Sequence, residues 1–245
     1  MSAEREYILR EMGLGPVWKL RAEPMEATVE VAPVAAPAAV GPGMAAVADP
    51  LVIAPDRDAM NWDDLRSAVA ECRKCRLCEM RKQAVLGVGD LNADWLFVGE
   101  GPGAEEDQRG EPFVGQAGKL LDNMLAAIGL KRGNDVYIAN AVKCRPPENR
   151  TPTPEETAAC LPYLERQVEL IQPKLIVALG RPAAQTLLQN EVKVGAARGR
   201  LHDYRGIPLI VTYHPAYLLR TLLDKAKAWE DFCFMRRTMK ERKGN

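Results

Sequence analysis

The stretch Asp94-Trp95-Leu96-Phe97-Val98-Gly99-Glu100-Gly101-Pro102-Gly103 joins a short apolar run directly to a glycine-rich loop. Three more apolar runs follow at residues 136–139, 175–179 and 209–213, and helix-like stretches separate them. Runs this short, bounded by glycine or proline, indicate strands that are buried on both faces. Their alternation with helices predicts an α/β sandwich around a parallel sheet.

Polar motifs follow the first, second and fourth of these predicted strands. They are the loop at 99–103, Asn140-Ala141-Val142-Lys143-Cys144-Arg145-Pro146-Pro147, and His214-Pro215-Ala216-Tyr217. Parallel sheets bind ligands beyond the carboxyl ends of their strands. We therefore expect the three motifs to meet at one edge of the sheet and to form an active site there.

The individual motifs indicate which class of ligand the site binds. The glycine loop lacks both the P-loop lysine and the Rossmann spacing, which argues against a nucleotide site, and Glu100 supplies a carboxylate. The Asn140 amide matches the edge of a nucleobase, although asparagine at such a position also stabilises turns. Phe113 is either a core residue or a platform for base stacking. The acidic run at 105–107 is either a divalent-metal site or, more commonly, a solvated turn.

Four of the six cysteines suggest a metal centre: Cys72, Cys75, Cys144 and Cys160. Zinc commonly uses two paired knuckles, and only one Cys-x-x-Cys pair is present here. The run from Cys72 to Cys78 resembles the start of a ferredoxin motif without its final Cys-Pro. Four thiolates from remote segments suit zinc or an iron–sulfur cluster, and Cys78 is then the spare.

The N-terminal region differs from the rest of the chain in amino-acid composition. Residues 1–22 predict a short helix that could dock on a partner protein, and residues 23–60 form an Ala/Pro-rich linker. No secretory signal opens the chain, and the apolar stretch at 31–48 is broken by prolines, so we expect a cytoplasmic protein without a membrane span. The net charge is −4 over residues 1–60 and +4 over residues 61–245, which is compatible with a polyanionic partner.

Taken together, these residues resemble the family 4 uracil-DNA glycosylases, the iron–sulfur branch of the uracil-DNA glycosylase superfamily. The resemblance runs from about Cys72 to the C-terminal helix, with the motifs in the same order and spacing. It implies a three-layer α/β/α sandwich with a four-stranded parallel sheet, spanning residues 61–245. It also implies a [4Fe–4S] cluster and a monomer that hydrolyses the N-glycosidic bond of deoxyuridine in uracil-containing DNA.

The resemblance assigns roles by motif position. Its cluster ligands correspond to Cys72, Cys75, Cys144 and Cys160. Its catalytic and base-binding positions correspond to Glu100 and Gly101 in the first loop, Phe113 for stacking, Asn140 for reading uracil, Asn149 acting with the loop glutamate, and His214 for stabilising the leaving group. Its DNA-contacting positions correspond to Tyr217, Leu218, Leu219 and Arg220 in the loop that enters the duplex, while Arg145, with Lys143 and Arg150, could hold phosphates.

Two features qualify this expectation. Gly101 stands where the best-known branch has a water-orienting aspartate, so Glu100, Asn149 or backbone must position the water. The segment 145–153 lacks the histidine of a covalent, uracil-trapping relative, which favours an enzyme that turns over. The alternatives are a non-catalytic iron–sulfur or zinc protein that binds nucleic acid, and an electron carrier; neither needs both Asn140 and His214.

Overall fold

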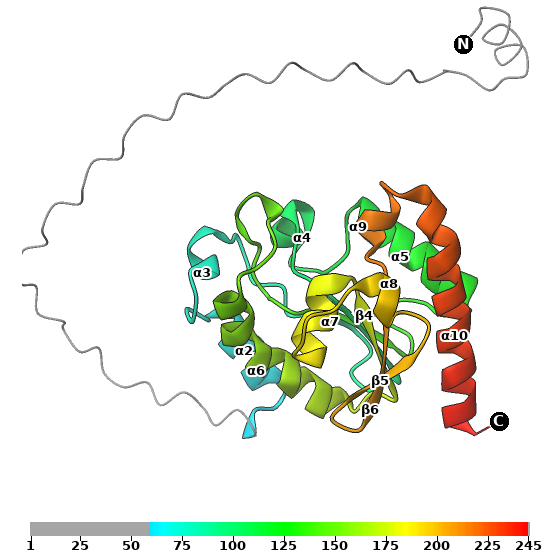
Figure 1. Ribbon diagram of the computed structural model, residues 1–245. Helices are drawn as coiled ribbons and strands as arrows, with labels where there is room; N and C mark the ends of the chain where they lie inside the picture. The colour runs from blue at the N-terminus through cyan, green and yellow to red at the C-terminus, as the bar shows by residue number, and fades with distance from the viewer. Residues whose placement is uncertain (1–58, 245) are drawn as a thin grey trace, which may run out of the picture. The chain divides into compact units, whose positions relative to one another are not determined.

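The computed structural model describes residues 59–244 (Figure 1). Its centre is a six-stranded sheet with the order β1-β3-β2-β4-β6-β5. The four central strands, β3 (Val136–Asn140), β2 (Trp95–Gly99), β4 (Leu175–Leu179) and β6 (Ile207–Thr212), are parallel. The predicted four-stranded parallel sheet is confirmed, and two antiparallel edge strands extend it: β1 (Val88–Gly89) and β5 (Leu201–Tyr204).

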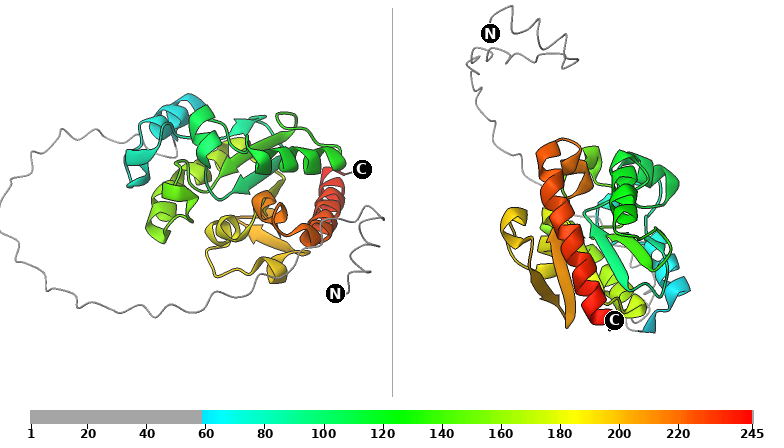
Figure 2. Two further views of the ribbon diagram at one scale, coloured as in Figure 1. Left: turned by 90° about the horizontal axis from the view of Figure 1, so that it is seen from above. Right: turned by 90° about the vertical axis from the view of Figure 1, so that its right-hand side faces the viewer.

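Helices cover both faces of the sheet, so the expected three layers are present. Alternate strand residues such as Leu96 and Ile176 pack on one face with α6 (Pro154–Ile171) and α7 (Arg181–Leu188). Their neighbours Phe97 and Val177 face the other way, toward α5 (Gln116–Ala127) and α10 (Lys225–Lys243). Figure 2 shows these helices on either side of the strands. Because central strands are buried on both faces, they read as continuous apolar runs.

Shorter helices connect the layers. They are α2 (Trp62–Ala70), α3 (Leu77–Met80), α4 (Ala104–Arg109), α8 (Val194–Ala197), α9 (Pro215–Leu218) and the 3-10 turns η2 (Pro147–Asn149) and η3 (Leu222–Asp224). A capping box formed by Asn61 and Asp64 begins α2, and one formed by Thr153 and Glu156 begins α6. Within residues 59–244, none of the helices combines the length and apolar character needed to cross a bilayer.

The start of the described chain is packed rather than extended. Met60 is buried in a cluster with Leu65 and Tyr163, and its carbonyl accepts a hydrogen bond from Arg166 Nε at 2.8 Å. The folded part therefore includes at least one residue that the sequence assigned to the linker. The expected docking helix at 1–22 and the linker residues 23–58 lie outside the described residues.

Candidate active site

The carboxyl ends of the central strands carry the predicted motifs to one edge of the sheet. Gly99 and Asn140 are register partners at the ends of β2 and β3, and His214 follows β6. A Cβ atom at Gly99 would lie 2.4 Å from Asn140 Oδ1 and 2.6 Å from the Phe113 ring. Glycine at this position therefore allows an amide and an aromatic ring to approach the strand end together.

Phe113 and His214 form one wall of the site. Their ring centroids are 5.5 Å apart and tilted by 31°. Phe113 has a left-handed backbone (φ 56°), and its carbonyl accepts a hydrogen bond from Arg132 at 2.7 Å. Such a conformation persists only where the surroundings enforce it. The ring is thus held in place rather than free to turn.

Glu106 on α4 braces two loops of the site. Its Oε1 accepts hydrogen bonds from the backbone N–H groups of Val114 (2.9 Å) and Gly115 (3.1 Å), next to Phe113. Its Oε2 accepts from the N–H of Gly103, in the first motif, at 3.1 Å. Within the same acidic run, Asp107 is buried and accepts from the N–H of Lys82 at 2.9 Å. The run is therefore neither a metal site nor a solvated turn; it ties loops together.

His214 is poised as a neutral hydrogen-bond donor. Its Nδ1 accepts the backbone N–H of Ala216 at 3.1 Å, so the proton of the neutral ring resides on Nε2. Burial, together with the nearby Arg220, lowers the pKa of His214 from 6.5 to about 4, against a smaller opposing effect of Glu106. The ring is therefore uncharged at neutral pH, with its Nε2–H available to a ligand.

Asn140 presents an unused acceptor. The residue is 2% exposed, and its side-chain Oδ1 has no hydrogen-bond partner among the described residues. A buried amide oxygen without a partner costs free energy, and such exceptions mark sites that await a ligand or water. Its location beside Gly99 places this acceptor in the site.

Glu100 lies close to residues that the sequence analysis did not single out. The Thr151 side chain and the positive charge of Arg181, at the start of α7, lie close enough to Glu100 to affect its pKa. Both effects lower the pKa of Glu100, but burial outweighs them and raises it. Asn149, expected to act with Glu100, instead accepts a hydrogen bond from Arg145 Nε at 2.7 Å through its Oδ1. The role of Asn149 beside Glu100 stays a prediction.

The four predicted cysteine ligands come together from three segments. Cys72, Cys75, Cys144 and Cys160 line one small cavity between α2, α6 and the loop after β3, and Cys78 does not line it. Arg81 donates a hydrogen bond to Cys144 Sγ (2.8 Å), and the N–H of Lys143 donates to Cys160 Sγ (3.2 Å). Such donors stabilise thiolate sulfur.

The cavity offers four sulfur donors to a metal centre. Zinc takes four thiolates around one ion, and a cubane iron–sulfur cluster takes four thiolates around four irons, so this set of donors suits either centre. Burial raises the pKa of Cys75, Cys144 and Cys160, the last to about 12, against smaller lowering effects of Arg81 on Cys144 and of Lys143 on Cys160.

Comparison with known proteins agrees with this arrangement. The family model "Uracil DNA glycosylase superfamily" matches residues 86–233. A type-4 uracil-DNA glycosylase of Archaeoglobus fulgidus is 47% identical over 165 residues, which cover 64% of this chain and 82% of the relative. The chain belongs to the uracil-DNA glycosylase superfamily, in its type-4 branch. A Thermotoga maritima type-4 enzyme is 49% identical (62% of this chain, 80% of the relative), and a Pyrobaculum aerophilum type-5 enzyme is 32% identical (64% and 83%).

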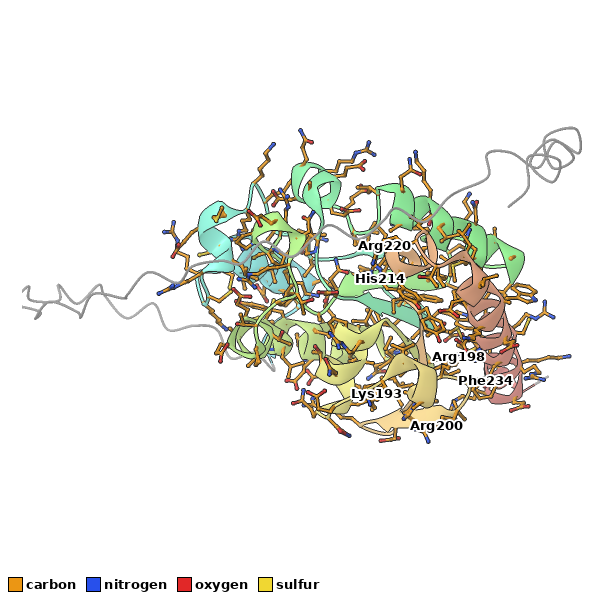
Figure 3. The ribbon with its side chains drawn as sticks, turned by 45° about the horizontal axis from the view of Figure 1, so that its top comes forward. Lys193, Arg198, Arg200, His214, Arg220 and Phe234 are labelled. Atoms are coloured by element: carbon orange, nitrogen blue, oxygen red, sulfur yellow. The ribbon has the colours of Figure 1, made fainter. Side chains whose placement is uncertain are left out.

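The duplex-entering loop expected for this glycosylase family lies at α9. Figure 3 shows Arg220 close to His214 at this end of the sheet. Leu219 is 42% exposed, whereas Leu218 is 0% exposed and packs inward. The expectation that Leu218 contacts DNA is therefore wrong for this structure. Tyr217 stacks on Tyr213 (centroids 5.3 Å apart), and its hydroxyl donates to Asp224 at 2.6 Å.

Several residues of this glycosylase site escaped the sequence analysis. Gly180, after β4, has φ +91°, and a Cβ there would lie 2.9 Å from the Cβ of His214. Leu222 and Leu223, just beyond the predicted loop, are exposed. The signal in the sequence was a glycine directly after the third predicted strand, as at the end of the first.

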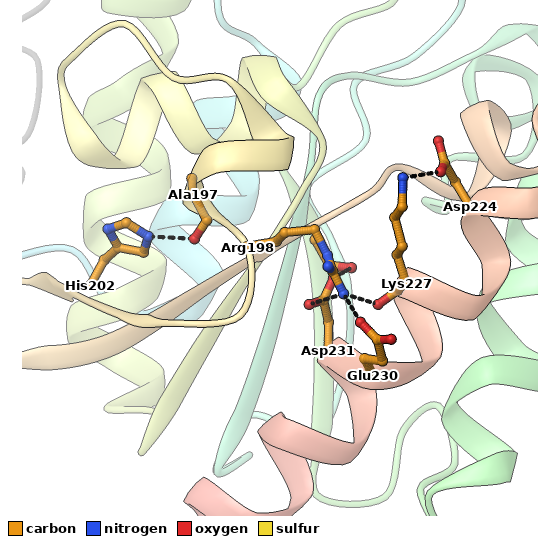
Figure 4. A network of polar contacts seen from close by, with 8 residues as sticks. Ala197, Arg198, His202, Asp224, Lys227, Glu230 and Asp231 are labelled. Atoms are coloured by element: carbon orange, nitrogen blue, oxygen red, sulfur yellow. Dashed lines mark hydrogen bonds and ion pairs between the residues drawn. The ribbon is translucent and has the colours of Figure 1, made fainter.

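A buried ion pair anchors the strand that carries His214. Thr212, at the end of β6, donates its hydroxyl to Asp231 on α10 at 2.7 Å. Asp231 in turn pairs with Arg198, which also contacts Glu230 (Figure 4). The other histidine of the chain, His202, is half-buried, with its Nε2 2.8 Å from the carbonyl oxygen of Ala197.

Proposed function

We propose that this protein is a uracil-DNA glycosylase that hydrolyses the N-glycosidic bond of deoxyuridine in DNA and leaves an abasic site. One observation carries the proposal: a hydrogen-bond donor and a free acceptor lie at the same edge of the sheet. The donor is the neutral His214, protonated on Nε2, and the acceptor is the unpartnered Oδ1 of Asn140. The type-4 and type-5 relatives, which are uracil-DNA glycosylases by name, support it. A non-catalytic nucleic-acid binder has no need for such a donor.

Recognition of the base follows from two contacts. The target nucleotide must leave the duplex, at an unstacking cost of roughly a few kcal/mol. The flipped ring stacks on Phe113, and Asn140 accepts the N3–H of uracil through Oδ1 while its NH₂ donates to O4. Cytosine presents the reversed pattern of donor and acceptor, so it would leave both amide atoms unpaired.

Bond cleavage depends on charge stabilisation. As the glycosidic bond breaks, negative charge develops on uracil and positive charge on the sugar. His214 donates its Nε2–H to the uracil oxygen and stabilises the departing anion as it forms. Glu100 is the proposed residue for positioning the water, because it directly follows the end of β2, at the same sheet edge as Asn140 and His214, whereas Asn149 is engaged by Arg145.

The DNA-contacting surface comprises Leu219, Arg220 and Tyr217, with Arg145 near the phosphates. Leu219 is the residue proposed to fill the space that the flipped base leaves in the duplex, because its side chain is exposed whereas that of Leu218 is buried. We expect the protein to act as a monomer in a reducing compartment, where free thiols persist.

The cofactor proposed for the cysteine cavity is a [4Fe–4S] cluster held by Cys72, Cys75, Cys144 and Cys160. When bound, it would cross-link the segment after α2, the loop after β3 and helix α6, and it has no redox role in the reaction. Around it, Arg81 and Lys143 supply positive charge. An iron-free preparation with four reactive thiols and full activity would contradict the cofactor assignment without touching the glycosylase assignment.

A uracil-excision assay tests the proposed function. A uracil-containing oligonucleotide is incubated with wild type, His214→Ala or His202→Ala, and abasic sites are then cleaved with alkali. We expect wild type and His202→Ala to produce strand scission, and His214→Ala to be slower by about 10²–10³ in kcat, the usual effect of removing one anion-stabilising donor. Absence of scission with wild-type enzyme on both single- and double-stranded substrates would overturn the proposal.

A further inference from the structure

Lys143 is a fully buried lysine between the base-reading residue and the cysteine cavity. It is 1% exposed, lies three residues after Asn140 and immediately precedes Cys144. Its Nζ donates to the backbone carbonyl of Asn140 at 2.8 Å and to the side-chain oxygen of Gln167. Gln167 is itself fixed, since its Nε2 donates to the carbonyl of Leu86 (2.9 Å) and to Tyr137 Oη (3.2 Å).

The charge of this buried ammonium needs an explanation. Moving an ammonium group out of water is costly unless an opposite charge compensates it. Both of its hydrogen-bond acceptors, the Asn140 carbonyl and the Gln167 amide, are neutral. Lys143 lines the same cavity as the four cysteines, and its own backbone N–H donates to Cys160 Sγ at 3.2 Å.

A second cation, Arg81, faces the same sulfurs in a different way. Its guanidinium donates to Cys144 Sγ and to the carbonyls of Ala70 and Cys72, so it touches the cavity and not the base-reading strand end. Of these two cations, Lys143 is the one that contacts both the cavity and the strand end. Four thiolates around an iron–sulfur core carry net negative charge, which both cations would offset.

We propose that Lys143 is a positioning residue that couples the cysteine-ligated centre to uracil recognition, because it lines the cysteine cavity, donates its backbone N–H to Cys160 Sγ and holds the backbone carbonyl of Asn140 with its ammonium. This inference rests on the proposed function, in which Asn140 reads the base. Without the ammonium, the buried Asn140 carbonyl loses a charge-assisted hydrogen bond, and the amide on the same residue is no longer fixed against Gly99.

Lys143→Met in the full-length, iron-loaded protein tests the coupling. Methionine keeps the length and apolar stem of lysine, and replacing a buried charge by an apolar group is often tolerated. We expect single-turnover kcat/KM on uracil-containing DNA to fall about 10–100-fold, the effect of losing a hydrogen bond to a charged group. The midpoint potential of the centre should also fall, since one positive charge has been removed beside it.

A double-mutant cycle separates positioning from general damage. Lys143→Met should cause no further loss in an Asn140→Ala background, because its effect passes through Asn140. Arg81→Met is the matched control: it should also lower the potential, but any loss of activity should multiply with that of Asn140→Ala. Multiplicative losses for Lys143→Met would overturn the inference, whereas inactivity of the wild type would overturn the proposed function instead.

Gln167→Leu keeps the test decisive if Lys143→Met does not bind iron. It preserves the ammonium and removes the side-chain amide, that is, the oxygen that orients Lys143 together with the Nε2 that donates to Leu86 and Tyr137. We expect normal iron content and a two- to tenfold loss of kcat/KM that disappears in the Asn140→Ala background. An iron-loaded Gln167→Leu protein whose loss persists in that background would refute the coupling.

Discussion

Ala216 donates its backbone N–H to Nδ1 of His214 across 3.1 Å, and this contact decides which ring nitrogen carries the proton. The turn at the start of α9 brings the Ala216 amide back onto the ring that precedes it. A doubly protonated imidazolium could not accept this hydrogen bond. The local backbone thus acts together with burial in keeping His214 neutral.

The pH dependence of His214 follows from its lowered pKa. The folded-state pKa is about 4, below the ordinary value of 6.5, so between these values the unfolded chain binds a proton that the folded protein does not. The contribution of His214 to the free energy of unfolding is complete above pH 6.5 and is lost as the pH falls toward about 4. The difference in unfolding free energy between wild type and His214→Asn should therefore change across this window. A constant difference would show that the folded-state pKa is normal.

The partner of Glu100 can be identified by a pH profile. Thr151 lowers the pKa of Glu100, so Thr151→Val should raise that pKa further and move the acid limb of the kcat profile to higher pH. Asn149→Ala is the control, because Asn149 bonds to Arg145 and should leave the acid limb in place. A shift in Asn149→Ala without one in Thr151→Val would support the role that the sequence suggests for Asn149.

The space at Gly99 can be tested with a single methyl group. In Gly99→Ala the new Cβ would lie 2.4 Å from Asn140 Oδ1 and 2.6 Å from Phe113 Cζ, so both base-binding groups must move. Overpacking of this kind typically costs about 1–3 kcal/mol of stability. We expect uracil excision to fall as well. Gly195→Ala, where the new methyl meets only Tyr213 Oη at 3.8 Å, should leave excision unchanged. Equal activities of the two variants would show that the strand end is not crowded.

How far the sequence predicts this fold depends on the strength of each local pattern. The central strands were identifiable because burial on both faces gives continuous apolar runs such as Leu175–Leu179. The edge strands were not: β1 has two residues, and β5 is mostly exposed, so neither carries a clear periodicity. Their pairing is decided by tertiary contacts with β3 and β6.

The site shows the same division. Glu100, Asn140 and His214 were predictable as neighbours because parallel strand ends share one edge of a sheet. The proximity of Thr151 to Glu100 was not, since the loop before Thr151 contains two residues with a left-handed backbone, Glu148 and Asn149, which no pattern in the sequence indicates. Leu218 was misassigned because α9 turns it inward and leaves Leu219 exposed. A helix of four residues is too short for the sequence pattern to indicate which of its side chains face the core.

Glu106 offers a way to loosen the site without touching a base-binding group. Glu106→Ala removes a carboxylate that accepts three backbone N–H groups from the loops around Gly103 and Phe113. Hydrogen bonds to a charged group contribute about 1.5–3 kcal/mol, and we expect a loss of this size in urea unfolding. The KM for uracil-containing DNA should rise as Phe113 gains freedom. Glu105→Ala, an exposed neighbour on the same first turn of α4, should change neither quantity. If both variants unfold at the same urea concentration, the brace contributes nothing and the ordering of Phe113 must come from Arg132 instead.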